Sequence, residues 1–224
     1  MDSKPISDVK LMDCMEGMAQ FPDKFFDLAI VDPPYGIGRD GQKKTTGGNG
    51  GRKAHSFKGW DNMRPDSEYF KELFRVSKNQ IIWGGNYFSN LLPPTMGWIM
   101  WDKGQRINQS DGELAFTSFN RALRIFEINR VALLMEGTIH PTQKPIALYE
   151  WLLKNYAKPG YKILDTHLGS GSSRIAAYKM GFDFWGFEID EDYFNDAEKR
   201  FRQSIAMPLF DAKAQPEQTK LFNQ

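Results

Sequence analysis

Residues 25–36 of the chain read Phe25-Phe26-Asp27-Leu28-Ala29-Ile30-Val31-Asp32-Pro33-Pro34-Tyr35-Gly36. The apolar run from Leu28 to Val31 predicts a buried strand. Pro33 and Pro34 must end it, because proline has no N–H to give to a sheet. Ligands of open α/β sheets bind at the carboxyl ends of strands, so we expect a binding crevice here, lined by Asp32, Pro33, Pro34 and Tyr35. An ordinary turn in which Tyr35 only packs is the alternative.

Composition limits what this stretch can belong to. At 224 residues and a net charge of +1, the chain can form one large domain, and nucleic acid would need a local basic patch. One cysteine, Cys14, excludes an internal disulfide, and the histidines are too scattered to predict a metal site. The sequence lacks an apolar run of membrane-spanning length and a secretion signal, so we expect a cytoplasmic protein without a membrane partner.

A basic, glycine-rich segment follows the first strand. Between Arg39 and Lys58 the only acid is Asp40, and we predict a mobile loop that binds a phosphate backbone. A solvated loop that happens to be basic is the alternative. The candidate nucleic-acid-binding residues are Arg39, Lys43, Lys44, Arg52, Lys53 and Lys58.

The other segments before residue 140 predict further strands and helices of one sheet. Residues 9–12 predict a short strand that ends at Asp13, where a helix cap and a ligand contact fit equally well. A helix is expected from Asp66 to about residue 77, and a short one at 86–88. Strands are expected at 80–85, 97–102 and 113–119, the last at an edge or partly exposed. Residues of about 103–139 are expected to include a small variable insert.

A second unit, at residues 162–188, has the order strand, glycine turn, helix, strand. Glu188 closes its second strand, where an acidic residue can accept the hydroxyls of a ribose. A dinucleotide site would have a third glycine where this chain has Arg174, so a nucleoside with an amino-acid tail fits better. A nicotinamide cofactor, or a unit without a ligand, are the alternatives.

Three motifs together resemble one family, the S-adenosylmethionine-dependent DNA amino-methyltransferases. They are Asp32-Pro33-Pro34-Tyr35, residues 140–145 (His-Pro-Thr-Gln-Lys-Pro) and residues 165–172 (Asp-Thr-His-Leu-Gly-Ser-Gly-Ser). Their order, with the catalytic motif first, resembles the beta group, and the likeness covers about residues 8–202. It implies an α/β fold with a doubly wound, mostly parallel seven-stranded Rossmann-like sheet. The methyltransferase domain would span 1–206, with a target-recognition insert at about 103–139 and a flexible tail at 207–224.

The resemblance also implies roles for individual residues. The target base would be held by Asp32, Pro33, Pro34 and Tyr35, the ribose of the cofactor by Glu188, and its carboxylate by Lys144. Asp13 and Cys14 would hold the adenine of the cofactor. The methionine end would be held by Asp165, His167, Gly169, Ser170, Gly171 and Ser172. The family usually has Pro-Phe where this chain has Thr166-His167.

The function implied is methyl transfer from S-adenosylmethionine to N6 of adenine in double-stranded DNA, by base flipping and direct transfer. Asp32 at the first motif position favours adenine, and N4 of cytosine is the alternative. A catalytically silent binding module, or an RNA or protein-amide substrate, also stay open. Such enzymes belong to bacterial or phage DNA methylation and restriction-modification. A homodimer is a further expectation, as is sliding-clamp binding through residues 218–222, Gln-Thr-Lys-Leu-Phe.

Overall fold

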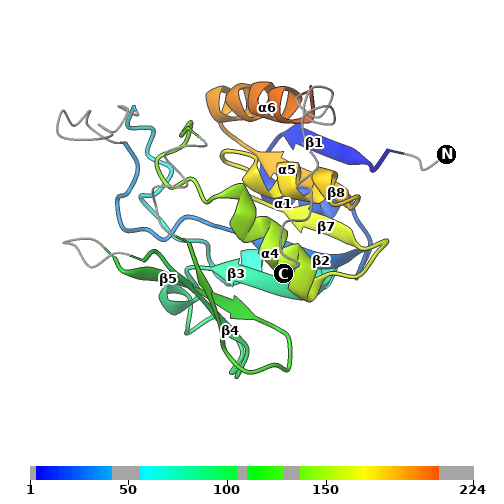
Figure 1. The fold of residues 1–224 in the computed structure, drawn as a ribbon. Helices are drawn as coiled ribbons and strands as arrows, with labels where there is room; N and C mark the ends of the chain where they lie inside the picture. The colour runs from blue at the N-terminus through cyan, green and yellow to red at the C-terminus, as the bar shows by residue number, and fades with distance from the viewer. Residues whose placement is uncertain (1–3, 42–55, 105–109, 129–136, 207–224) are drawn as a thin grey trace, which may run out of the picture.

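The computed structural model describes residues 4–41, 56–104, 110–128 and 137–206. These residues form one eight-stranded sheet in the order β1-β8-β7-β2-β3-β5-β4-β6 (Figure 1). The strands are β1 (Ser7–Leu11), β2 (Phe26–Val31), β3 (Ser77–Trp83), β4 (Trp98–Asp102), β5 (Gly112–Thr117), β6 (Arg124–Glu127), β7 (Lys162–Asp165) and β8 (Asp183–Glu188).

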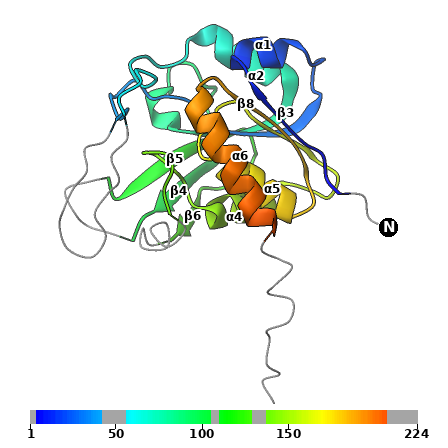
Figure 2. The ribbon, with the colours of Figure 1, turned by 90° about the horizontal axis from the view of Figure 1, so that it is seen from above.

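Helices cover both faces of this sheet. One face carries α1 (Cys14–Ala19) and α2 (Ser67–Val76), and the other carries α4 (Ile146–Tyr156), α5 (Ser172–Lys179) and α6 (Glu191–Ala206) (Figure 2). A 3-10 helix, η1 (Gly85–Tyr87), follows β3. Each face has its own apolar core, one around Phe26, Leu73 and Phe187 and the other around Ile30 and Leu152. The predicted doubly wound α/β fold is therefore confirmed.

Local sequence signals explain where the elements begin. Asp13 caps α1 by accepting the backbone N–H of Met15 at 2.8 Å, and Asp66 caps α2 by accepting that of Glu68 at 2.9 Å. Residues 28–31 of β2 are buried, as their apolar character predicts. At the carboxyl end of β2, the two prolines direct the chain into the next loop.

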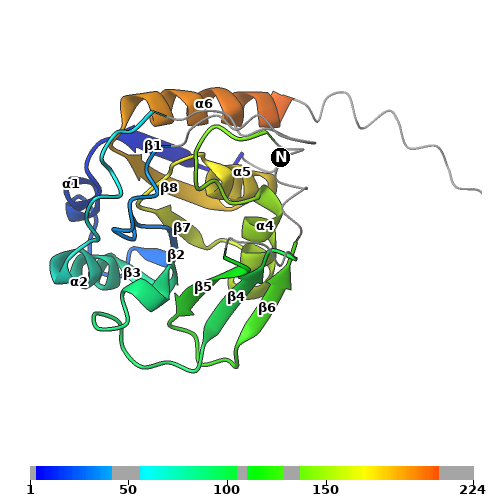
Figure 3. The same ribbon diagram turned by 90° about the vertical axis from the view of Figure 1, so that its left-hand side faces the viewer.

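The sheet differs from the predicted one at its far end. Five of its seven pairings are parallel, but β5 pairs antiparallel with both β3 and β4. Thus β5 is an interior strand and not an edge strand, and its first three residues are partly exposed, which is the other predicted alternative. The eighth strand is β6, which pairs with β4 and whose four residues are too few and too exposed to show a pattern (Figure 3).

The predicted insert is partly sheet. Both β5 and β6 lie within 103–139, so this segment contributes two strands instead of forming a separate unit. Residues 105–109 and 129–136, and the tail 207–224, lie outside the described residues. In the part of the chain that the structure describes, no helix has the length and apolar character needed to cross a bilayer.

Candidate active site

The residues of the predicted catalytic and cofactor motifs lie on one edge of the sheet. Asp32 follows β2, Asp165 ends β7 and Glu188 ends β8, and these three strands are parallel neighbours. Adjacent strands lie about 4.8 Å apart, so Asp32 and Glu188 are separated by about 10 Å across the sheet. Burial raises the pKa of Asp165, and the Asp32 charge adds to the rise. The sheet therefore brings the two motifs within electrostatic reach of each other.

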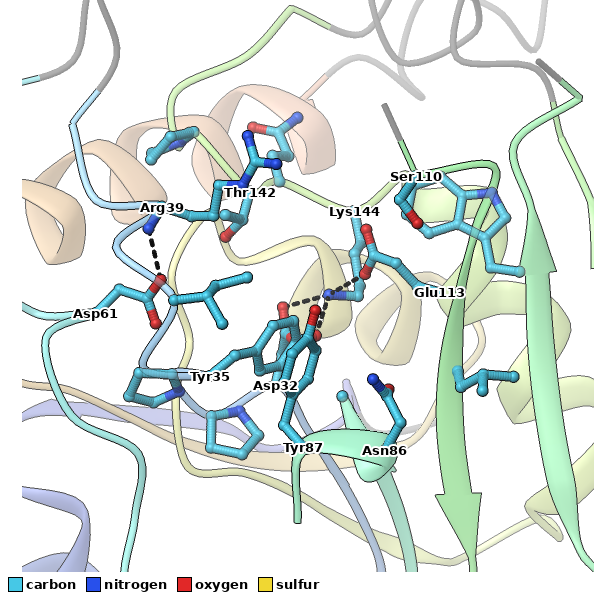
Figure 4. A pocket seen from close by; sticks show the side chains of 18 of the residues that line it. Asp32, Tyr35, Arg39, Asp61, Asn86, Tyr87, Ser110, Glu113, Thr142 and Lys144 are labelled. Atoms are coloured by element: carbon cyan, nitrogen blue, oxygen red, sulfur yellow. Dashed lines mark hydrogen bonds and ion pairs between the residues drawn. The ribbon is translucent and has the colours of Figure 1, made fainter. Parts of the chain in front are cut away.

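Asp32 is the centre of a cluster of polar groups in which Lys144 is buried and the others are partly exposed (Figure 4). Its Oδ1 accepts a hydrogen bond of 2.5 Å from the Tyr35 hydroxyl, and its Oδ2 forms an ion pair with the ammonium of Lys144. The same ammonium lies 3.1 Å from Oε2 of Glu113, whose Oε1 is 2.7 Å from the ammonium of Lys103. Two carboxylates thus share Lys144, whose side chain is 2% exposed.

These contacts set the protonation of the cluster. Burial raises the pKa of Asp32, and the Lys144 ammonium only partly offsets the rise. Burial would also raise the pKa of Glu113, but Lys144 and Lys103 outweigh it and lower that pKa to about 2. Burial works to lower the pKa of Lys144, yet Asp32 and Glu113 raise it. The cluster therefore holds a charged lysine between two acids.

The Tyr35 ring is enclosed by a second aromatic ring and by backbone. It stacks on the ring of Tyr87, with centroids 4.9 Å apart and planes 15° apart. A Cβ at Gly84 would lie within 2.7 Å of Cδ1 and Cζ of Tyr35, so only glycine allows the ring this position. A base that stacks on the face covered by Tyr87 would have to displace Tyr87. Base stacking by Tyr35 stays a prediction.

A cavity of about 580 Å³ opens over this cluster. It is lined by the whole Asp32–Tyr35 motif, by Lys144 and Glu113, and by Arg39 and Trp101. The predicted cofactor residues Asp165 and Glu188 are not among its lining residues; they follow on the same edge, one and two strands away. The cavity therefore lies over the predicted catalytic motif, and the predicted cofactor motif lies beside it.

The glycine turn is built around Glu188. Its Oε2 accepts the backbone N–H of Gly169 at 2.8 Å, and its Oε1 accepts those of Ile189 and Asp190 at 3.0 Å each. Gly171 caps α5 at φ 70°, a conformation that favours glycine. Arg200 of α6 donates to the carbonyl of Ser170 and the hydroxyl of Ser172, at 2.8 Å each. A carboxylate has about four acceptor positions, so Glu188 retains one for a ribose hydroxyl.

Asp165 fits a ligand that carries a positive charge. Its oxygens accept from the backbone N–H of His167 at 3.1 Å and from the hydroxyl of Ser173 at 2.5 Å. Burial raises its pKa to about 7, and it has no ion-pair partner among the residues described. The ammonium of a methionine tail would supply the missing cation. The residues of this turn therefore fit S-adenosylmethionine.

The departure at Thr166-His167 forms a short hydrogen-bonded chain. The Thr166 hydroxyl lies 2.7 Å from the Tyr69 hydroxyl and 2.9 Å from Nδ1 of His167, whose ring meets Tyr69 edge-on. Burial lowers the pKa of His167 to about 4, so the imidazole is neutral. Burial also raises the pKa of Cys14 to about 12, which keeps its thiol protonated. Their contacts with the cofactor stay predictions.

Two predicted binding residues have partners inside the protein. The ammonium of Lys144 is shared by Asp32 and Glu113. Lys58 pairs with Asp190 at 2.6 Å and Asp192 at 2.7 Å, so it fastens its loop to the start of α6. The sequence did not predict these internal partners, because the acids come from distant parts of the chain, and the roles of Lys144 toward the cofactor and of Lys58 toward DNA stay predictions.

The other basic candidates are less constrained. Arg39 is exposed, lines the cavity, and donates its backbone N–H to Asp61 at 2.7 Å. Its neighbour Asp40 is buried, and its Oδ2 accepts backbone N–H groups from Lys58, Gly59 and Trp60. The remaining candidates, Lys43, Lys44, Arg52 and Lys53, lie outside the described residues. A role in DNA binding therefore stays a prediction for Arg39 and for those four residues.

Three residues of the site were not predicted from the sequence. Glu113 and Lys103 carry no motif: the alternation of residues 113–119 marked only the segment of Glu113 as a strand, and Lys103 directly follows the predicted strand at 97–102. Tyr87 was assigned to a short helix, without a contact. Among the described residues, no group of three histidine, cysteine or acidic side chains has the geometry of a metal site.

Comparisons with known proteins agree with this geometry. The family model N6_N4_Mtase, described as DNA methylase, matches residues 94–199. The putative methylase YubD of Escherichia coli (strain K12) is 26% identical over 84% of this chain and 87% of its own length. The type II methyltransferase M.HinfI of Haemophilus influenzae is 24% identical over 85% of this chain and 67% of its own length.

These matches support an S-adenosylmethionine-dependent DNA amino-methyltransferase. The fold agrees as well: the crystal structure of the M1.HpyAVI-SAM complex has a TM-score of 0.59 at 19% identity, covering 86% of this chain and 98% of that one. In this chain the predicted catalytic motif precedes the predicted cofactor turn in the sequence, and the parallel neighbours β2, β7 and β8 bring the two together at their carboxyl ends.

Proposed function

We propose that this methyltransferase transfers the methyl group of S-adenosylmethionine to N6 of adenine in double-stranded DNA. The proposal is supported above all by the shared edge of β2, β7 and β8, which sets Asp32 beside Asp165 and Glu188. The target base would be turned out of the duplex into the cavity over Asp32, since its amino group is paired inside the helix.

The residues of the cavity would activate a poor nucleophile. The lone pair of an exocyclic amine is delocalised into the base. If the Asp32 carboxylate and the Pro33 carbonyl accept its two hydrogens, the nitrogen becomes pyramidal and its lone pair is free to attack. S-adenosylmethionine supplies an electrophilic methyl group on its sulfonium. The nitrogen that receives it is acidic and loses its proton without a strong base.

Different residues would hold the different parts of the cofactor. Asp165 would bind the ammonium of the methionine tail, because it is a buried acid without an ionic partner among the described residues. Glu188 would accept a ribose hydroxyl at its remaining lone pair. Asp13 and Cys14, which begin α1 next to the end of β8, would contact the adenine.

The choice of adenine rests on Asp32 at the first position of its motif. The matching family model is named for both N6 and N4 methylation, so cytosine N4 is the second candidate. To decide, the protein is incubated with DNA and labelled S-adenosylmethionine, and the DNA is digested to nucleosides. Label on N6-methyladenine is expected. Label on N4-methylcytosine alone would refute the adenine assignment, and no label on any DNA would favour a silent binding module.

The partners beyond DNA are proposed from the sequence. Residues 218–222 would dock on a bacterial sliding clamp, and a synthetic peptide of the tail should bind purified clamp in a titration. No binding at high micromolar concentration would contradict this. A homodimer and a place on the bacterial nucleoid are proposed as well. Sedimentation of the purified protein, with and without DNA, tests the first, and imaging of a tagged chain tests the second.

A further inference from the structure

The ammonium of Lys144 lies where the proposed function places the amino group of the target base. It forms an ion pair with Oδ2 of Asp32, and Oδ1 is taken by the Tyr35 hydroxyl. A charge-assisted hydrogen bond is roughly twice as strong as a neutral one. A neutral amine therefore cannot displace the ammonium from Asp32 unless the ammonium has another acceptor.

Glu113 is that acceptor. Its Oε2 lies 3.1 Å from the Lys144 ammonium, so a small movement of the side chain away from Asp32 keeps the charge paired. Lys103 binds the other oxygen of Glu113 at 2.7 Å, which leaves Oε2 for Lys144. Lys144 is almost completely buried, and without Glu113 its release from Asp32 would leave a buried charge unpaired, which is strongly unfavourable.

We propose that Glu113 is a positioning residue that acts through Lys144. It takes over the ammonium when the target base enters and so frees Asp32 to accept the amino hydrogens. The inference rests on the proposed function, because it assigns a step to the same site. The cavity thus selects for an amino group only while Glu113 is ionised and can pair with the Lys144 ammonium.

Several elements contribute other charged or titratable groups near the transfer of Lys144 from Asp32 to Glu113. Tyr35 follows β2 and donates to Asp32, while Lys103 follows β4 and pairs with Glu113. Tyr149 of α4 and Asp165 of β7 lie within electrostatic reach of Asp32. None of these four residues forms an ion pair with Lys144, so Glu113 is the residue to test.

The test measures recognition of the amino group without cofactor. Once methylated DNA has been sequenced, two duplexes are made: one carries the target base, and the other carries purine, or 2-pyrimidinone for a cytosine target, at that position. Fluorescence anisotropy gives the ratio of the two dissociation constants. The variants are Glu113→Gln, Lys144→Met and the double substitution. Glu68→Gln, an exposed glutamate on α2, is the matched control for the lost charge.

Wild type and Glu68→Gln should prefer the duplex that carries the amine. Glu113→Gln should reduce both this preference and kcat roughly tenfold, because the Lys144 ammonium stays paired with Asp32. Lys144→Met leaves Asp32 without an ionic partner and Glu113 with Lys103 alone, and it should also lose preference. The double substitution removes the Lys144 ammonium, which competes for Asp32, together with its acceptor Glu113. It should restore most of the preference for the amine. Such rescue is not expected of a merely structural glutamate.

Three results are decisive. If Glu113→Gln keeps the wild-type preference, or if the double substitution is no better than Glu113→Gln, the inference is overturned while the proposed function stands. If wild type transfers no methyl group and shows no preference, both fail together. Thermal melts by circular dichroism identify unfolded variants, and Glu113→Asp, which keeps the charge, should then show a preference between wild type and Glu113→Gln.

Discussion

Asp165→Asn is expected to stabilise the cofactor-free protein, and to do so more at pH 8 than at pH 5. Burial raises the pKa of Asp165 from 3.8 to about 7. The folded state therefore binds this proton more tightly than the unfolded state, which favours folding at low pH. That contribution is lost as the pH rises from about 4 to about 7. Asparagine does not ionise, so it avoids the loss.

The magnitude follows from the shift. One pKa unit corresponds to about 1.4 kcal/mol, so a shift of about three units costs the wild type about 4 kcal/mol at pH 8 and less than half of that at pH 5. Asparagine also alters the hydrogen bonds to Ser173 and His167, a change of about 1 kcal/mol each. This change does not depend on pH. The difference between the two pH values, about 3 kcal/mol, is therefore the quantity to measure.

Urea denaturation followed by circular dichroism at both pH values gives the free energies of unfolding. Asp27→Asn is the control of opposite sign: despite partial burial, Lys78 and the backbone of Lys162 lower the pKa of Asp27. Its contribution is present above the ordinary pKa of a carboxyl and lost as the pH falls, so Asp27→Asn should destabilise at pH 8. If Asp165→Asn changes the free energy of unfolding equally at both pH values, the reasoning about a buried, unpaired acid is refuted.

Three further predictions follow from the site. Asp32→Ala should abolish methyl transfer while calorimetry finds the dissociation constant of S-adenosylhomocysteine within about twofold of wild type; a collapse of cofactor binding would contradict the division between the two motifs. Gly84→Ala should cost about 1–3 kcal/mol in urea denaturation, more than Gly181→Ala, because both have positive φ but only Gly84 faces the Tyr35 ring. Lys58→Met should lower the melting temperature and leave the salt dependence of DNA binding unchanged; a reduced salt slope would show instead that Lys58 contacts phosphate.

Much of the fold follows from local sequence signals. Proline at positions 33 and 34 ends β2 and aspartate at 13 and 66 caps helices, because these effects involve only neighbouring residues. The order of strands depends on pairing between distant segments, so the sequence left open whether β5 lies at an edge, and the structure places it between β3 and β4. The short strand β6 has no periodicity to recognise.

The site shows the same division between local and distant effects. Asp32, Asp165 and Glu188 could be predicted because each ends a recognisable strand. Glu113 could not, since its meeting with Lys144 depends on β5 being inserted next to β3. Lys144 was recognised as a site residue, but its partner was not, because an ammonium binds whichever acid the fold brings to it.

The carboxylate of Asp40 affects how freely the length of the segment 42–55 can vary. By binding the backbone of residues 58–60, it ties the two ends of the segment 42–55 together, and Gly41 lies so close that a Cβ there would be 3.1 Å from Cα of Phe57. The closure entropy of a flexible connection rises only with the logarithm of its length. A longer or shorter segment between residues 41 and 56 of this chain should therefore cost little extra closure entropy, while Asp40 keeps the residues on either side of it together.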